Sequence, residues 1–194
     1  HCISSAASDV YKRQILYKSG AFKYKLDDHE DVMALFKNKR ATISMGYIGL
    51  YETATVFYGP NWEHNDEAKA FTIEILKEMQ RLQKQWTKQY DIWFSIYSTP
   101  SESLTDRFCR LDQERFGDIP DITSKGYYQN SFHYDVRKDI TPFEKLDFEK
   151  DYPYYASGGF IHYCEYPKLN HNIKALEAVW DLSLIHISEP TRPR

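Results

Sequence analysis

The sequence is short of cysteine and of long apolar runs. Its 194 residues include three cysteines, Cys2, Cys109 and Cys164, and no Cys-x-x-Cys pair. An odd number of scattered cysteines argues against a disulfide framework and favours a reducing compartment, so we expect a cytoplasmic protein. No apolar run approaches the length that spans a bilayer, and we therefore expect a soluble chain with no membrane partner.

An excess of positive charge is also missing. The formal net charge is −3 at pH 7, without the basic footprint of nucleic-acid-binding proteins, so we expect no nucleic-acid partner. Apolar residues are plentiful at 42%, and aromatic residues reach 16%. That composition excludes a disordered chain, and 194 residues suffice to bury the core of a full domain.

The two ends differ in character from the sequence between them. SSAASDVYKRQ near the N-terminus and LSLIHISEPTRP near the C-terminus resemble in-frame translation of transposon-type sequencing adapters. The N-terminal stretch is small and polar, and it lacks the apolar segment that a secretory signal needs. We therefore expect residues 1–14 and 182–194 to be adapter-derived and residues 15–181 to be a fragment of a longer natural chain. A docking tail is the alternative at the C-terminal end.

The body of the sequence alternates between strand and helix patterns. Strands are predicted over residues 43–47, 92–97, 129–136 and 159–165. Helices are predicted over residues 28–40, from Leu50, over Asp66–Tyr90, over Ser101–Phe116, from Thr141 and from Asn172. Alternation of this kind indicates an α/β fold with buried, largely parallel strands.

Local signals are strongest in two of these helices. Asp66–Tyr90 has apolar residues at spacings of three and four, which predicts an amphipathic helix covering a sheet, with a coiled-coil partner as the alternative. The helix from Thr141 has a threonine cap, Pro142 in its first turn and Glu144 at the capping-box position. Asp28 is the expected cap of the first predicted helix.

The most informative junction is YSTPSESLTDRF, where a predicted buried strand ends at Tyr97 and a helix follows. Three hydroxyl residues surround the start of that helix: Ser101, Ser103 and Thr105. Free amides, the positive end of the helix dipole and hydroxyl donors together suit a phosphate group. An ordinary N-cap with Glu102 in a capping box is the alternative; beside a phosphate, Glu102 would instead serve a reacting hydroxyl as general base.

The cysteines and histidines carry weaker signals. Cys109 lies on the apolar side of a predicted helix, where a free cysteine is usually a small core residue. Cys164 follows His162 by two residues in a predicted strand, so a Cys-His nucleophile is conceivable, but a structural role is favoured. The spacing of His162, Cys164 and His171 fits no standard zinc site, and we expect no metal site in the chain.

The predicted strand over residues 129–136 alternates in polarity. Ser131, His133 and Asp135 would face one side of it. Phe132, Tyr134 and Val136 would face the other. His133 could line a cavity together with Ser131, but a hydrogen-bonded core histidine is the favoured interpretation.

Four motifs, TPSESLTDRF, NSFHYDV, TPFEKLDFEK and GGFIHYCEYP, resemble those of the anaerobic (class III) ribonucleoside-triphosphate reductases. They lie within Ala41–Asp181 in the order that the family has. The resemblance implies a glycyl-radical enzyme that reduces ribonucleotides to deoxyribonucleotides without oxygen. It also implies a fold, a ten-stranded α/β barrel, of which residues 15–181 would be a fragment from the C-terminal half.

Specific residues follow from the same resemblance. Tyr97 and Glu102 match positions that line the substrate and formate pocket, so they would be the catalytic residues. Ser101 and Ser103, and less directly Thr105, match the turn that holds the substrate phosphates. Ser98 departs from the family, in which a glycine is common at this position.

The resemblance implies cofactors and partners for the whole enzyme rather than for this fragment. They are a glycyl radical, zinc, ATP, dATP and other nucleotide effectors, formate as reductant in many members, a homodimer partner and a radical-SAM iron–sulfur activating enzyme. Neither Cys109 nor Cys164 matches a catalytic cysteine of the family, so we expect no cofactor within the fragment and no activity from it alone. The alternatives are a fragment of another glycyl-radical enzyme and a non-catalytic α/β nucleotide-binding domain.

Overall fold

The computed structural model describes residues 12, 14–21, 26–27, 29–98, 101–163 and 172–188. The chain forms two compact units, one made of His1–Ile43 with Leu82–Phe94 and the other of Ser44–Arg81 with Ser95–Arg194. None of the helices in the described ranges is long and apolar enough to cross a lipid bilayer.

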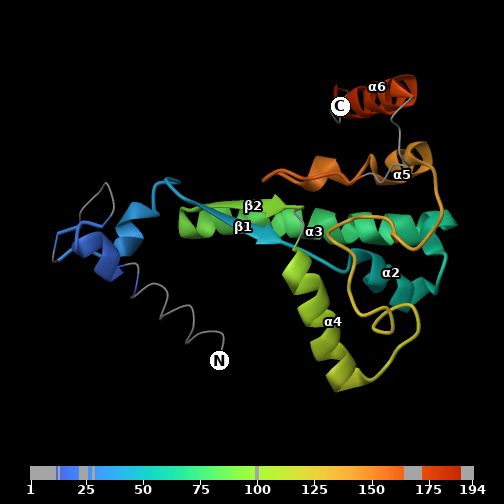
Figure 1. Cartoon of the computed structure of the whole chain (residues 1–194). Coiled ribbons are helices and arrows are strands. Elements are labelled where there is room, and N and C mark those ends of the chain that lie inside the picture. Colours follow the sequence, from blue (N-terminus) through green and yellow to red (C-terminus); the bar gives the residue numbers. More distant parts are fainter. Residues whose placement is uncertain are drawn as a thin grey trace. The chain divides into compact units, whose positions relative to one another are not determined.

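The elements follow one another as a mixture of helices and short strands (Figure 1). The strands are β1 (Thr42–Gly46) and β2 (Trp93–Tyr97). The α-helices are α2 (Leu50–Tyr58), α3 (Asp66–Tyr90), α4 (Glu102–Phe116), α5 (Pro142–Glu149) and α6 (Ile173–Ser188). Among the described residues, short 3₁₀ helices also occur: η1 (Val32–Leu35), η2 (Trp62–His64) and η3 (Pro153–Tyr155).

Two of the four predicted strands are confirmed. β1 and β2 pair in a two-stranded sheet and run in the same direction (Figure 1). The hydroxyls of Ser44 and Ser95 lie 2.9 Å apart across this pair. The described part of the molecule therefore combines helices with a small parallel sheet, in agreement with the α/β pattern of the sequence.

The strand predicted over residues 129–136 is wrong. Within the described residues it makes one bridge, the antiparallel one between Asn130 and Ile48. Ser131 has a φ of 40°, a left-handed conformation that breaks an extended backbone. Residues of both predicted faces are buried: His133 and Asp135 on one, Phe132 and Tyr134 on the other. The alternation in polarity therefore does not correspond to one buried and one exposed face of a strand.

The strand predicted over residues 159–165 is also wrong over its described part, residues 159–163. It makes a single parallel bridge, between Phe160 and Ser98. The backbone there begins at Gly159 with a φ of 106°, which prevents a regular extended approach to β2. Cys164 and His171 lie outside the described residues.

The helix predicted over residues 28–40 is reduced to the single turn of η1. Asp31 caps it, accepting a hydrogen bond from Met33 N at 3.0 Å, and Asp28 lies outside the described residues. Asn38 and Lys39 then adopt left-handed φ values of 58° and 56°. Their backbone N–H groups donate to Asp91, at 2.8 Å to its carboxylate and at 3.1 Å to its carbonyl, and these bonds replace the helical ones.

The prediction for α3 is confirmed at both ends. Asn65 begins it, accepting hydrogen bonds from Glu67 N at 2.9 Å and Ala68 N at 3.3 Å. Near its C-terminal end the helix lies against β2, where Gln83 Nε2 donates to the carbonyl of Phe94 at 2.7 Å. This contact supports the prediction of a helix that covers a sheet.

The core around the candidate site joins α2, α3 and α5 to the loop that follows α4. Its fully or nearly fully buried members are Leu50, Leu76, Phe132 and Tyr152. The rings of Phe132 and Tyr152 are stacked, with centroids 5.5 Å apart and planes 2° apart. A second cluster, made of Tyr51, Ala54, Trp62 and Ala68, adjoins Phe148, which also packs against the first.

Three further helix predictions hold. The capping box of α5 is formed, with Thr141 N donating to Glu144 Oε2 at 2.8 Å and Glu144 N donating to Thr141 Oγ1 at 3.3 Å. Cys109 of α4 is a buried, free core residue, and burial raises the pKa of its thiol. α6 begins where predicted and continues past Asp181.

Candidate functional site

The junction between β2 and α4 is built as a strand followed by a helix N-terminus. β2 ends at Tyr97, and Ser101 is the N-cap of α4. The backbone N–H of Ser101 donates to Asn130 Oδ1 at 2.8 Å, which fixes the entry of the helix. The side chain of Ser101 makes no capping hydrogen bond. The serine contribution to the capping box, which was the alternative to a phosphate site, is therefore not formed.

The three hydroxyl residues of this helix start differ in exposure. Ser101 is half-buried and Ser103 is exposed in the first turn. Thr105 is buried, as is Cys109 one turn later, so these two mark the inner side of α4. The carbonyl of Thr105 accepts a hydrogen bond from Tyr128 N at 3.2 Å. Ser101 and Ser103 are thus the hydroxyls nearest the free amides, and Thr105 lies on the side that packs inward.

A glycine pair lies beside the end of β2. Gly158 N donates to the carbonyl of Ile96 at 2.7 Å, and Ser98 N donates to the carbonyl of Gly159 at 3.0 Å. A Cβ on Gly158 would lie 2.7 Å from Ser95 Oγ, so only glycine permits this approach. The motif GGFIHY is thereby held against the strand that ends at Tyr97.

Tyr97 and Ser98 are fixed by this neighbourhood. The ring of Tyr97 lies over Gly159, where an added Cβ would be 3.6 Å from Tyr97 Cε2. Ser98, the departure from the family's common glycine, is fully buried and donates from Oγ to Tyr47 Oη at 2.8 Å. Burial raises the pKa of Tyr47, so its phenol stays protonated and available as a hydrogen-bond partner.

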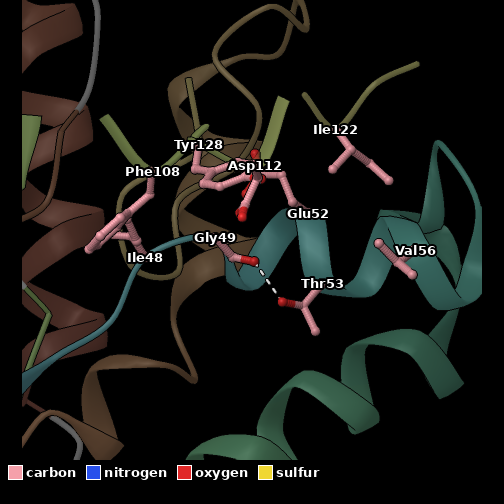
Figure 2. Close-up of a pocket in the computed structure, with 9 residues that line it drawn as sticks. All are labelled: Ile48, Gly49, Glu52, Thr53, Val56, Phe108, Asp112, Ile122 and Tyr128. Atoms are coloured by element: carbon pink, nitrogen blue, oxygen red, sulfur yellow. Dashed lines mark hydrogen bonds between the residues drawn. The ribbon is translucent and has the colours of Figure 1, made fainter. Parts of the chain in front are cut away.

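A pocket of about 310 Å³ lies between α2 and α4 (Figure 2). Its lining residues are Ile48, Gly49, Glu52, Thr53, Val56, Phe108, Asp112, Ile122 and Tyr128. Tyr128 Oη donates to Asp112 Oδ2 at 2.9 Å, and burial together with Asp112 raises the pKa of Tyr128. Carboxylates and an uncharged phenol make this pocket unsuited to a phosphate group.

A buried carboxylate adjoins that pocket and holds the following loop. Glu52 of α2 forms a buried ion pair with Lys125. The same oxygen, Oε1, accepts a hydrogen bond from Gln129 N at 3.0 Å. Because the charges of Glu52 and Lys125 are both buried and paired, neither side chain is a free acid or base. The pair instead positions the loop after α4, which contains Lys125 and Gln129.

Three side chains that could hold a metal ion converge near the end of α5. His133, Glu149 and His162 each offer a ligand atom, and these atoms lie within 4.8 Å of one another. Burial would raise the pKa of Glu149, but the imidazoles of His133 and His162 and the ammonium of Lys145 lower it well below its usual range. Glu149 is therefore a buried, ionised carboxylate.

Sequence reasoning missed this cluster. It did not single out Glu149, and it considered His162 only with Cys164 and His171. The available signal was the occurrence of single histidines inside two apolar motifs, FHY and IHY, with Glu149 between them in the sequence. That signal gains meaning only when the fold brings the three residues together.

Comparison with known proteins gives the chain a family. The profile of the family described as anaerobic ribonucleoside-triphosphate reductase matches residues 2–188. The enzyme of that name from Escherichia coli (strain K12) is 49% identical over 174 residues, which are 89% of this chain and 24% of that protein. The one from Haemophilus influenzae is 51% identical over 170 residues, 87% of this chain and 24% of that protein. The one from phage T4 is 44% identical over 173 residues, 89% of this chain and 27% of that protein.

The chain thus spans about a quarter of the length of the curated relatives that it matches. The match includes the junction at Tyr97 and the three segments that carry His133, Glu149 and His162. With a profile match over nearly its whole length and identities near one half, the chain belongs to the anaerobic ribonucleoside-triphosphate reductase family.

Proposed function

We propose that this chain supplies part of the substrate pocket of an anaerobic ribonucleoside-triphosphate reductase, an oxidoreductase that makes deoxyribonucleotides, and that it is inactive alone. The observation that carries the proposal is the family match across the turn between β2, which ends at Tyr97, and α4, which begins at Glu102. The whole enzyme would be built on a ten-stranded α/β barrel of which this chain is a segment.

The helix N-terminus of α4 is the proposed phosphate site. Its first amides have no partners within the helix, and its dipole favours a negative group. Ser101 has a hydroxyl that does not cap the helix, and Ser103 is exposed beside it. Both hydroxyls would donate to the triphosphate, while Thr105, which is buried, would support the turn from within.

Tyr97 and Glu102 are the proposed catalytic residues. In the whole enzyme, the family's thiyl radical would abstract the ribose 3′-hydrogen. Loss of the 2′-hydroxyl as water then requires a proton at the 2′-oxygen and release of the proton from the 3′-oxygen. Glu102 would take the 3′-hydroxyl proton as general base, and Tyr97 would order the pocket by hydrogen bonding.

The remaining parts of the proposal concern the whole enzyme. It would work as a homodimer in the cytoplasm, activated by a radical-SAM iron–sulfur protein and regulated by ATP, dATP and other nucleotides. Formate would serve as reductant in the pocket that Tyr97 and Glu102 line. The family's zinc site and glycyl radical would be contributed by sequence other than that of this chain.

Exchange of Glu102 tests the catalytic role. In the complete reductase that carries this segment, Glu102→Gln should abolish turnover while glycyl-radical formation and nucleotide binding persist. Glu114→Gln, at an exposed position near the C-terminal end of the same helix, is the matched control and should keep full turnover. Unchanged turnover in Glu102→Gln would remove Glu102 from the mechanism.

The phosphate site has its own test. Ser103→Asp places a negative charge at the proposed site and should raise the KM for the nucleotide at least tenfold, since like charges repel at short range. Ser103→Asn is close in size and uncharged, and it should change KM far less. Equal KM values for the two variants would show that no phosphate binds there.

We also propose that residues 1–14 and 182–194 are adapter-derived and do not belong to the natural enzyme. The family profile overlaps part of both ends, and α6 extends through Ser188, so sequencing of the source DNA is the direct test. The proposal expects genomic reads that diverge from this sequence near residues 15 and 181. Reads that continue unchanged through both ends would refute it.

A further inference from the structure

Three segments far apart in the sequence bring metal-ligating side chains to one place. His133 comes from the loop between α4 and α5, Glu149 is the last residue of α5, and His162 follows η3. His162 Nδ1 lies 3.0 Å from Glu149 Oε2, and His133 Nδ1 lies 3.5 Å from Glu149 Oε1. The two imidazole rings meet edge to face with centroids 6.2 Å apart.

The histidine on the inner side of this cluster is buried without a hydrogen bond. His133 is 4% exposed, and neither of its ring nitrogens forms a hydrogen bond with a described residue. A buried imidazole normally has a partner for at least one nitrogen, because an unsatisfied polar group in the interior is costly. A metal ion bound to one of the two ring nitrogens of His133 would provide the missing partner.

The carboxylate is held so that one of its oxygens is used for structure. Glu149 Oε1 accepts a hydrogen bond from Tyr134 N at 2.8 Å and forms an ion pair with Lys145. Glu149 Oε2 is the oxygen that faces His162. The lysine ammonium opposes a divalent cation, so its contact with Oε1 directs a metal to Oε2. Such second contacts are what orient metal-binding carboxylates in proteins.

The donor set selects the kind of metal. Two neutral imidazoles and one carboxylate are a poor site for Mg²⁺ or Ca²⁺, which prefer oxygen ligands, and a good one for zinc. Zinc–ligand bonds are about 2.0–2.2 Å long, so ligand atoms of one site lie at most about 4 Å apart. The 3.0 Å between His162 Nδ1 and Glu149 Oε2 falls on this scale. The ligand atoms of all three residues lie within 4.8 Å of one another, so a bound ion would draw His133 slightly closer to the other two.

We propose that His133, Glu149 and His162 form a zinc site, with a fourth position left for water. Two histidines and a glutamate are a known zinc ligand set with one open position. The site lies within this fragment, so it differs from the zinc that the family resemblance implies for the whole enzyme rather than for this fragment. The inference does not depend on the proposed reductase chemistry, because zinc binding is measured without nucleotide, radical or turnover.

Zinc titration of the metal-free chain tests the proposal. The chain should bind about one Zn²⁺ that survives dialysis against a weak chelator, measured by elemental analysis and by calorimetric titration. His162→Ala and His133→Ala should each weaken the affinity at least a hundredfold, more than the 10–100-fold typical of losing a supporting contact. His64→Ala changes an exposed histidine elsewhere in the chain and is the matched control, with unchanged affinity.

Cobalt substitution identifies the ligand atoms. Co²⁺ bound at the proposed site should give visible bands of a nitrogen- and oxygen-ligated ion without thiolate-to-cobalt charge transfer. The presence of that charge transfer would assign the metal to a cysteine and overturn the proposal. Retained affinity in both His162→Ala and His133→Ala, or absence of zinc from the folded parent chain, would overturn it as well.

Folding of the variants is checked by circular dichroism. If the isolated chain aggregates, the same exchanges are made in the complete reductase, where parent protein should hold one zinc more than either histidine variant. Equal zinc content in parent and variants would then refute the site. Loss of zinc with retained turnover, or the reverse, separates this inference from the proposed function.

Discussion

Helix α3 and the 129–136 segment are stabilised in opposite ways. α3 satisfies its backbone N–H groups internally, one turn along the same helix. The 129–136 segment has neither helix nor sheet ladder, and it donates to buried carboxylates instead: Gln129 N to Glu52 and Tyr134 N to Glu149. These acceptors lie 77 and 15 residues away in the sequence. The segment's conformation therefore depends on distant charges, whereas that of α3 does not.

The largest expected effect comes from removing a charge that stabilises the segment. Lys125→Met leaves Glu52 buried and unpaired beside Gln129, which should destabilise the chain by about 3–5 kcal/mol. The double variant Glu52→Gln/Lys125→Met removes both charges and should recover most of the loss. The free energies come from urea unfolding followed by tryptophan fluorescence.

The outcome discriminates between two descriptions of the loop. A loss below about 1 kcal/mol in Lys125→Met would mean that the pair behaves like an exposed ion pair and does not hold the segment. No recovery in the double variant would mean that Lys125 acts through packing, for example through its contact with the ring of Tyr51, rather than through charge.

The same contrast explains which features the sequence could predict. The period of three and four in Asp66–Tyr90 and the Thr141–Glu144 capping box are local, and the structure reproduces both. The alternation of the 129–136 segment had the period of a strand, but its backbone makes one isolated bridge, at Asn130, and two of its N–H groups donate to side chains instead of to a neighbouring strand. A polarity pattern cannot distinguish these cases, because it does not show whether the polar residues face solvent or, like Ser131, His133 and Asp135, are buried.

The candidate site likewise contains one part that the local sequence predicts and one part that depends on contacts between distant segments. The turn between β2 and α4 was predictable because a strand end and a helix start adjoin in the sequence, at Tyr97 and Ser101. The meeting of His133, Glu149 and His162 was not, because it requires the loop, α5 and the segment after η3 to fold onto one another. Spacing along the chain carries no information about that convergence.

An intermediate effect is expected at alkaline pH in the core beside the segment. Tyr152 stacks on Phe132, and burial raises its pKa, although the hydrogen bond with Thr72 acts in the other direction. The unfolded chain loses the phenol proton near pH 10 while the folded chain retains it. Stability is thus complete below pH 10 and falls above it, by about 1.4 kcal/mol per pH unit for each such tyrosine.

Exchange of this tyrosine checks the pH effect. Tyr152→Phe should be less stable at neutral pH, because Thr72 loses one of its two hydrogen-bond partners and keeps only the Lys69 carbonyl, but its stability should fall less steeply between pH 10 and 11. Tyr154→Phe changes an exposed neighbour and should keep the parent slope. Equal slopes in the parent and Tyr152→Phe, from urea unfolding at each pH, would remove Tyr152 from the alkaline transition.

The smallest effect is expected on the exposed face of α3. Arg81 pairs with Glu78 at 2.7 Å, and both side chains are more than half exposed. Water and salt screen such a pair, and alanine favours a helix as much as arginine does, so Arg81→Ala should leave the urea midpoint unchanged within error. A shift as large as that of Lys125→Met would show that α3 also depends on specific charges, and the contrast between the two regions would fail. Because its apolar stripe carries the packing, α3 should tolerate this change, and the same measurement in high salt should give the same midpoint difference.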